Sequence, residues 1–455
     1  MKRVRVGVGA GFSGDRLDAA LPLVERGEIG YLVFECLAER TIALAQKDRL
    51  RDAARGYHPF LEERLRRVLA ACKARGVKIV SNMGAANPVA AGERAAAVAR
   101  ELEISDYKIA VVTGDDVLEI VRNGDYVAAE TGQPIAELTD VVSANAYLGI
   151  EPIRQALEQG ADLVLTGRVA DPSLILAPAA HEHGWSNDDW QRLGAGTVVG
   201  HLLECAAQVT GGYFADPGYK DVPNLADVGY PIAEIEASGE ALVSKTPQSG
   251  GIVSTATCKE QMLYELHDPA RYLTPDVTAD FTGVRLRQVE RDVVRVTGGN
   301  GHARPDTLKV TVGYRAGWIG EAQVSYGGPG ATERARLAGQ IVLDRLEYLG
   351  VKPLDTRAEV VGVDSLYPGS APVAARASVL GAMAEPYEAR VRVAARCRTQ
   401  EEAEMVVHEV DSLGLNGPSG GSIAAMGIRE VLGVVSTFVS RDLIRPTVTV
   451  TTVRA

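Results

Sequence analysis

Charged and amide side chains follow the apolar runs in the N-terminal half of the chain. Each run is short and rich in Val, Ile and Leu, which predicts a buried β-strand. In a mostly parallel sheet the carboxyl ends of the strands share one edge, and ligands bind in the crevice outside that edge. Arginine among carboxylates and amides suits a small anionic ligand better than a hydrocarbon. The residues at these strand ends are Asp15, Arg16, Glu35, Glu39, Arg40, Asn82, Asn87, Thr113, Asp115, Asp116, Asn145, Arg168 and Asp171.

Arg168 is the strongest candidate for binding, because it follows a strand and a glycine directly in the run Leu-Thr-Gly-Arg. A guanidinium group offers a planar fork of donors that can bind a carboxylate or phosphate through two hydrogen bonds. We therefore predict that Arg168 and Arg16 hold the anionic group of a substrate, and that Lys245 reaches a thioester oxygen or a phosphate. The other predicted binding residues are Arg40, Asn82, Asn87, Asp115 and Asn145.

Four carboxylates at the same edge could perform acid–base chemistry. We predict that Glu39 or Asp171 is the general base toward a carbon acid or water. Glu35 or Asp15 would be the partner carboxyl, kept protonated by its like-charged neighbour. Structural alternatives exist, since Asp171 suits a helix N-cap, as does Asn87, and Glu39 with Arg40 suits an ordinary charge pair at a helix start.

A glycine pattern opens the chain. The residues Gly9, Gly11 and Gly14 follow a predicted strand as G-x-G-x-x-G, and Glu35 ends the next strand. This spacing matches the dinucleotide-binding fingerprint. However, Asp15 and Asp18 resemble a capping pair, and a carboxylate there would repel a pyrophosphate. NAD or FAD is therefore the less favoured ligand, and the alternative is a glycine loop that lets two backbone segments approach closely.

Two further glycine loops could bind an anion through backbone N–H groups. Gly250 and Gly251 lie in the segment 244–254, and Gly420 and Gly421 lie in the segment 416–427, before a predicted helix. Either pair could simply form a tight turn. Together the loops allow a phosphate-bearing ligand such as a CoA thioester.

Neither histidines nor cysteines indicate a metal site. His181 and His183 are spaced i, i+2, which is not the i, i+4 spacing of the common zinc helix, and the other histidines stand alone. The five cysteines are scattered and form no C-x-x-C pair, so neither a disulfide framework nor a zinc knuckle is indicated. We predict no metal and no tightly bound cofactor.

The composition excludes several classes of partner. The 455 residues carry a net charge of −11, which disfavours nucleic acid and anionic membrane surfaces. No uninterrupted apolar run is long enough to span a bilayer, and the N-terminal residues alternate basic residues with valine, unlike a signal peptide. A cytoplasmic location is therefore expected.

The elements that would position these residues indicate an α/β fold, with a mostly parallel sheet flanked by helices in the N-terminal half. A strand-rich region and a C-terminal α+β region follow. The predicted domains are 1–210, 211–330 and 331–455. The predicted strands of the first domain are 3–8, 31–35, 77–81, 107–113, 140–146 and 161–167.

Several segments resemble the acyclic terpene utilisation (AtuA-like) family over nearly the whole chain. They are GAGFSGDR, GYLVFECLAERT, SNMGAANP, LTGRVADPSL and YELHDPARYLTPDV. Members occur with genes for the breakdown of branched, carboxylated acyl-CoA compounds, as in geraniol and citronellol catabolism. The resemblance implies an enzyme that acts on acyl-CoA or hydroxy-acid intermediates. Some relatives carry a further domain of about a hundred residues, which this sequence lacks after TVTVTTVRA, so a small second subunit of that size is expected.

The combined prediction is a catabolic lyase or hydratase that acts on a branched carboxylic acid or an acyl-CoA. Two alternatives stay open: an NAD(P)-dependent oxidoreductase, and a non-catalytic large subunit that needs a small partner. A homo- or hetero-oligomer is expected, and neither nucleic acid nor a membrane is expected as a partner.

Overall fold

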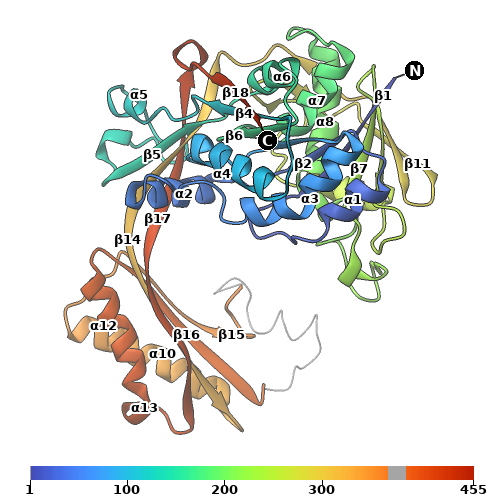
Figure 1. The fold of residues 1–455 in the computed structure, drawn as a ribbon. Coiled ribbons are helices and arrows are strands. Elements are labelled where there is room, and N and C mark those ends of the chain that lie inside the picture. The colour runs from blue at the N-terminus through green and yellow to red at the C-terminus, as the bar shows by residue number, and fades with distance from the viewer. Residues whose placement is uncertain (1, 367–385, 455) are drawn as a thin grey trace. The chain divides into compact units, whose positions relative to one another are not determined.

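The computed structural model describes residues 2–366 and 386–454. The chain folds into two compact units, one formed by Met1–Gly313 with Val434–Ala455 and the other by Tyr314–Gly433. It leaves the first unit within strand β14 (Thr307–Gly327) and returns within strand β17 (Gly421–Ser440) (Figure 1). The predicted borders at residues 210 and 330 rest on the character of the sequence and stay a prediction.

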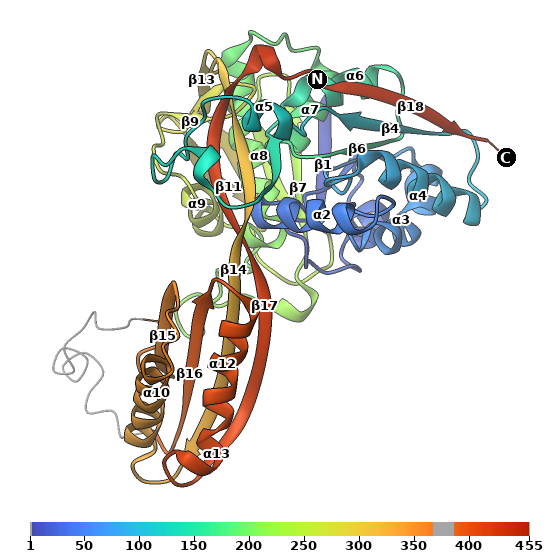
Figure 2. The ribbon, with the colours of Figure 1, turned by 90° about the vertical axis from the view of Figure 1, so that its left-hand side faces the viewer.

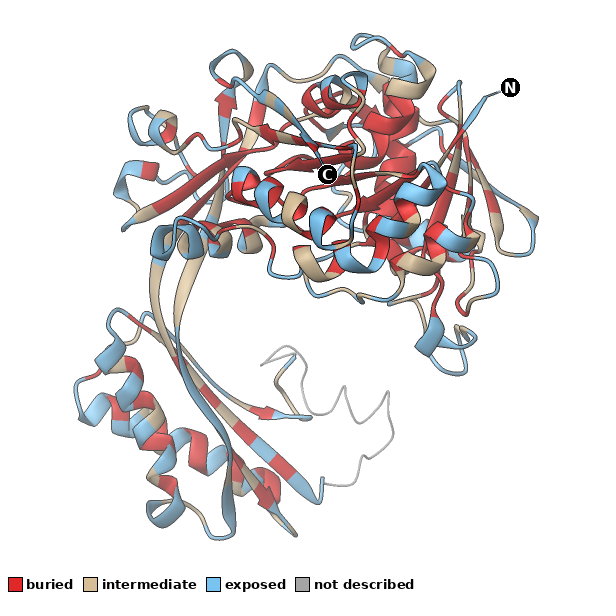
Figure 3. Ribbon diagram, in the orientation of Figure 1, coloured by how far each residue is buried: buried red, intermediate tan, exposed pale blue. Residues whose placement is uncertain are grey.

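Five parallel strands form the centre of the first unit's sheet. They are β1 (Arg3–Ala10), β2 (Tyr31–Phe34), β3 (Lys78–Ser81), β6 (Leu163–Thr166) and β4 (Tyr107–Thr113), in this spatial order. Their residues are almost all buried, because helices cover both faces of the sheet (Figure 3). A parallel sheet covered in this way needs continuous apolar runs, which explains why these strands do not alternate between polar and apolar residues. The predicted mostly parallel α/β sheet is confirmed.

Antiparallel strands extend this sheet on both sides to ten strands. On the β1 side the order is β7 (Pro231–Glu236), β8 (Ala241–Lys245), β12 (Val293–Thr297) and β11 (Arg285–Glu290). On the other side β18 (Thr447–Val453) pairs with β4 from Thr447 opposite Thr113 to Val453 opposite Tyr107. The C-terminal strand thus covers an edge that β4 would otherwise expose.

Helices cover the two faces of the sheet (Figures 1 and 2). One face carries α1 (Ala20–Arg26), α3 (Leu61–Arg75) and α4 (Pro88–Glu101), and the other carries α6 (Ile150–Glu158), α7 (Ser173–His183) and α8 (Trp190–Glu204). Helix α8 is buried over most of its length. Further helices are α2 (Glu39–Arg51), α5 (Leu118–Arg122) and α9 (Thr255–Leu263).

The remaining elements of the first unit are short. A small sheet contains β13 (Asn300–His302), β10 (Thr278–Asp280) and β9 (Tyr272–Leu273) in this order. The 3₁₀ turns are η1 (Ile135–Glu137), η2 (Ala206–Gln208), η3 (Leu225–Asp227) and η4 (Arg441–Leu443). Within the described ranges no helix has the length and apolar character needed to cross a membrane.

The prediction that residues 140–146 form a sixth strand of the parallel sheet is wrong. The segment forms β5 (Val141–Ala146), which pairs with β14, because β6 pairs directly with β4 and leaves no place between them. Its buried polar residue Asn145 also needs a hydrogen-bonding partner that the apolar layers of the central sheet do not offer. Asn145 finds such a partner in Asp115.

The second unit has the β-α-β-β-α-β order of a split-βαβ, ferredoxin-like fold. In the part of this unit that the structure describes, the elements between β14 and β17 are α10 (Ala331–Tyr348), β15 (Asp355–Val361), β16 (Glu388–Cys397), α12 (Gln400–Asp411) and α13 (Leu413–Asn416). The sheet order is β15, β16, β14, β17. Along β16, Ala389, Val391 and Val393 are buried while the residues between them are more exposed, as expected for a sheet with helices on one face.

The prediction of a helix after the segment 416–427 is also wrong. The segment continues as strand β17, which pairs with β14. Gly427 and Gly433 disfavour a helix in this segment. The segment continues with the β-branched residues of VVSTFVS, which favour a strand. Pairing with β14 then decides its conformation.

Candidate functional site

A cavity of about 870 Å³ lies in the first unit, at the carboxyl ends of β1, β2 and β6. Its wall includes the loop residues Gly11–Ser13, the segment from Glu35 to Thr41, and the segment from Arg168 to Pro172. Residues of the segments 264–275 and 305–309 also line it, as do Tyr147, Cys205 and Phe438. This position is the one at which open α/β sheets bind ligands, and the volume suits a small organic molecule.

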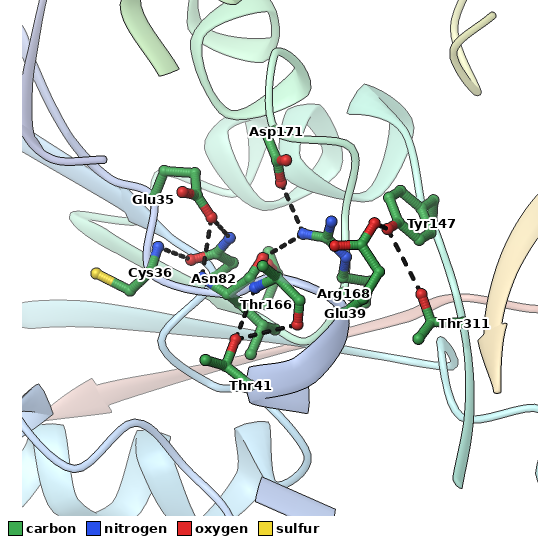
Figure 4. A network of polar contacts seen from close by, with 12 residues as sticks. Glu35, Cys36, Glu39, Thr41, Asn82, Tyr147, Thr166, Arg168, Asp171 and Thr311 are labelled. Carbon is green, nitrogen blue, oxygen red and sulfur yellow. Dashed lines mark hydrogen bonds and ion pairs between the residues drawn. The ribbon is translucent and has the colours of Figure 1, made fainter. Parts of the chain in front are cut away.

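Arg168 lies at the centre of the polar wall. Its side chain is only 1% exposed, and Nη1 donates to the backbone oxygen of Leu37 and, at 2.6 Å, to Oδ1 of Asp171 (Figure 4). The guanidinium carbon lies 4.0 Å from the ring centroid of Tyr147, a cation–π contact. Among the described residues Nε is buried without a hydrogen-bond partner.

Glu39 is held by a second cation. Its carboxylate accepts a hydrogen bond from the hydroxyl of Tyr147 and lies 3.0 Å from Nζ of Lys309 (Figure 4 shows Glu39 with Tyr147). Burial would raise the pKa of Glu39, but Arg168, the Tyr147 hydroxyl and Lys309 outweigh it and lower the pKa to about 2. Glu39 is therefore ionised at neutral pH. Its place in the first turn of α2 also favours a negative charge.

Glu35 has the opposite protonation state. Its Oε1 accepts hydrogen bonds of 2.9 Å from Nδ2 of Asn82 and from the backbone N–H of Leu37. The amide of Asn82 can only have this orientation, because its oxygen accepts from the backbone N–H of Cys36. Burial, reinforced by the nearby charge of Asp171, raises the pKa of Glu35 well above its usual range. Burial therefore favours the protonated form of Glu35.

The pKa of Asp171 responds to both burial and a neighbouring cation. Burial raises the pKa of Asp171, its ion pair with Arg168 lowers it, and the charges of Glu39 and Glu265 raise it further, with a net upward shift. The cavity therefore holds three carboxyl groups whose environments drive their pKa values apart. This pattern is typical of sites that perform acid–base chemistry.

Asp115 and Asn145 support Arg168 from outside the cavity. Oδ2 of Asp115 accepts from Nδ2 of Asn145 and from the backbone N–H of Arg168, both at 2.9 Å. At Gly167 a side chain would overlap the carboxylate of Asp115. Burial raises the pKa of Asp115 to about 6. The structure thus brings both predicted residues to the site, as supports of the turn that carries Arg168.

Five other predicted residues do not line the cavity. Arg16 is exposed and donates to the backbone oxygens of Leu225 and Ala226. Asp15 accepts from the backbone N–H of Gly11 at 2.8 Å and from the hydroxyl of Tyr230.

Of the remaining three, Asn87 caps α4 and donates to the backbone oxygens of residues 53 and 55. Lys245 donates to the backbone oxygen of Ser249 at 2.8 Å, and Arg40 is exposed on α2.

The opening glycines serve close packing of the backbone. At Gly11 a Cβ would lie 2.6 Å from the backbone nitrogen of Ala206. The carboxylate of Asp15 occupies the N–H of Gly11, and α1 begins only at Ala20, so no helix N-terminus follows the loop directly. Gly9, in β1, packs against Phe34 of β2, and Gly14 lies beside Phe12.

The other two glycine loops lie outside the cavity lining. Gly250 and Gly251 pack against the backbone of Asn224 and Thr210. Gly420 and Gly421 belong to the second unit, where Gly420 has a left-handed conformation with φ of +76°. Their predicted role in anion binding stays a prediction.

A comparison with protein families matches residues 4–450 to the acyclic terpene utilisation family protein AtuA. The chain belongs to this family. The matched range contains every residue that lines the cavity. The searches of curated proteins and of solved structures returned no match.

The AtuA-family site also contains residues that the sequence analysis missed. Tyr147 and Lys309 come from the end of β5 and from β14, and the pairing of these two strands was not predicted. Outside the cavity lining, His201 and Glu204 form a buried pair with 2.8 Å between Nδ1 and Oε1, and burial raises the pKa of Glu204 to about 7. Their i, i+3 spacing in α8 was the available signal.

No group of three or more His, Cys, Asp or Glu side chains in the described part of the chain is arranged to hold a metal ion. The carboxylates of the AtuA-family cavity instead have Arg168, Lys309 and amide groups as partners. The polar wall can therefore bind an oxygen-rich group and exchange protons with it.

Proposed function

We propose that this AtuA-family chain is an enzyme, a hydratase or related lyase, that acts on a branched carboxylic acid or its acyl thioester. The observation that carries the proposal is the contrast between two carboxyl groups in one cavity. Glu35 is held protonated by burial, whereas Glu39 is held ionised by Arg168, Tyr147 and Lys309. Pairs of this kind supply an acid and a charged group at the same pH.

Substrate binding would use the guanidinium of Arg168. An N–H of this group would donate to the carboxylate or thioester oxygen of a ligand. The stacked ring of Tyr147 fixes the plane of the guanidinium. Apolar side chains of the cavity wall would surround the branched hydrocarbon part, and they are Phe12, Leu37, Leu273, Leu308 and Phe438.

Proton transfer would use Glu35 and Asp171. In the direction of water loss, Asp171 accepts a proton from the carbon next to the carboxyl group, and Glu35 donates its proton to the departing hydroxyl, which leaves as water. A proton returned from Asp171 to Glu35 restores the starting state. Asp171 suits the base better than Glu39, because its pKa is raised whereas that of Glu39 is about 2.

Location and assembly belong to the same proposal. The cytoplasmic location expected from the sequence, and a catabolic role in keeping with the family description, are part of the proposal. A small second subunit and an oligomeric state stay predictions, which native mass spectrometry of the purified chain would test. A copurified chain of about a hundred residues would support the first of them.

The decisive experiment measures the reaction with branched enoic acids and their CoA thioesters. Deuterium uptake at carbon in D₂O and incorporation of labelled water report on the two proton transfers. We expect Glu35→Gln and Asp171→Asn each to lower kcat by about 100-fold or more, while leaving the fold intact. Arg16→Ala is the control, because Arg16 is exposed and outside the cavity lining. Equal activity of all four proteins would contradict the proposal.

A further inference from the structure

Ser13 and His58 meet at the wall of the cavity. Ser13 lines the cavity in the loop after β1, and His58 lies just before α3 with only 3% of its surface exposed. Oγ of Ser13 lies 3.0 Å from Nε2 of His58. A serine and a histidine at this distance could be a nucleophile and its base, so the position of the imidazole proton decides their role.

The imidazole proton resides on Nε2. The backbone N–H of Phe60 donates to Nδ1 of His58 at 3.2 Å, so Nδ1 must be unprotonated. Burial, together with the charge of Arg64, lowers the pKa of His58 to about 4, so the ring is neutral at physiological pH. A neutral imidazole with a bare Nδ1 carries its proton on Nε2.

The direction of the Ser13 hydrogen bond follows from this tautomer. Nε2–H of His58 donates to Oγ of Ser13, so His58 cannot accept the serine proton and cannot activate a nucleophile. The hydroxyl hydrogen of Ser13 has no acceptor among the described residues. It is therefore available to a molecule in the cavity.

The neighbouring backbone adds two more donors. The N–H groups of Phe12 and Ser13 donate to no residue that the structure describes, whereas the N–H of Gly11 is taken by Asp15. The loop lines the cavity and thus has three donors that no described residue uses. Such a set is complementary to a carbonyl or carboxylate oxygen.

We propose that Ser13 donates a hydrogen bond to the carboxylate or thioester carbonyl oxygen of the substrate, and that His58 is the positioning residue that directs this hydrogen bond. The class of substrate rests on the proposed function. The Ser13 hydroxyl can donate to the oxygen of a free acid or of a thioester. Binding measurements with one probe of each kind distinguish these two substrates.

Binding of dimethylacrylate and of its CoA thioester tests the role of Ser13. Calorimetry should show Ser13→Ala binding one or both probes about 10-fold to 100-fold more weakly than the wild type. Thr274→Val is the matched control, because Thr274 also lines the cavity but already donates its hydroxyl hydrogen to the backbone oxygen of Val277 at 2.8 Å. Unchanged affinity in Ser13→Ala for both probes would overturn the inference.

Two substitutions at His58 test its positioning role. His58→Phe should weaken binding, because it removes the Nε2–H that orients Ser13. His58→Gln should restore most of the affinity, because its amide N–H can take the place of Nε2–H. Equal weakening in both variants would indicate a merely structural role and would contradict the assignment.

Nitrogen NMR of labelled histidine tests the tautomer without any ligand. The signals of His58 should show a protonated Nε2 and a bare Nδ1, and Ser13→Ala should shift the Nε2 signal. A proton on Nδ1 would overturn the inference while the proposed function, which rests on Glu35 and Asp171, stands. Conversely, a wild-type chain that binds the acid through Ser13 but exchanges no protons with it would overturn only the proposed function.

Discussion

Glu35 and Glu39 are four residues apart in the sequence, yet their environments shift their pKa values in opposite directions. Glu35 is surrounded by an amide and a backbone N–H, whereas Glu39 faces Arg168 and Lys309. Sequence reasoning placed both at the sheet edge and gave the protonated role to Glu35 or Asp15, but it did not identify the tyrosine and lysine beside Glu39. The reason is physical: Lys309 is 270 residues away from Glu39, and only the paired strands β5 and β14 bring Tyr147 and Lys309 beside it.

The charge of Glu39 makes stability depend on pH. Its pKa of about 2 in the folded chain is below the ordinary value of 4.5, so its ionised form stabilises the fold above pH 4.5 and this contribution is lost as the pH falls toward 2. We expect Glu39→Gln to lower the free energy of unfolding at pH 7 by about 1 kcal/mol, because solvent screens a half-exposed pair. Urea unfolding should show this difference shrinking below pH 4.5. A difference that grows on acidification would contradict the assignment.

The positions of the central β-strands were predictable from the sequence, whereas the pairing of the other strands was less predictable. Five of the six predicted strands lie in the parallel sheet, since uninterrupted apolar runs between helices have few other solutions. Residues 140–146 do not, because tertiary pairing with β14 decides their place. The opening glycines matched a nucleotide fingerprint, but short motifs do not reveal which atoms lie opposite them.

Gly11 tests the packing account of that loop. Gly11→Ala would force a Cβ against the backbone at Cys205 and Ala206, so we expect a loss of stability of about 1–3 kcal/mol. Gly30→Ala is the control, because the nearest atom to its Cβ would be the backbone oxygen of Arg5 at 3.8 Å. Thermal unfolding compares the two variants. Equal stability of Gly11→Ala and Gly30→Ala would show that a Cβ at residue 11 does not overlap the backbone of Cys205 and Ala206.

The cavity is formed entirely by the first of the two compact units. Every residue that lines it lies within Met1–Gly313 or Val434–Ala455, and the segment Tyr314–Gly433 forms a separate unit with its own hydrophobic core. The sequence did not reveal this organisation, because one unit is inserted between two strands of the other. The C-terminal strand β18 is needed to complete the first unit's sheet.

This organisation predicts that the inserted unit can be removed without destroying the cavity. A variant in which a short Asn-Gly turn joins Gly313 to Val434 should fold and bind dimethylacrylate with the affinity of the full chain. Circular dichroism and calorimetry provide the measurement. A folded variant that no longer binds the acid would show that the second unit contributes to the site.

The protonation of Glu35 at neutral pH is the central claim, and infrared spectroscopy measures it directly. The difference spectrum between the wild type and Glu35→Gln at pH 7 should contain the carbonyl stretch of a protonated carboxylic acid, because burial raises the pKa of Glu35 well above its usual range. That band should persist in Arg16→Ala. A difference spectrum that shows only the bands of an ionised carboxylate would contradict the account.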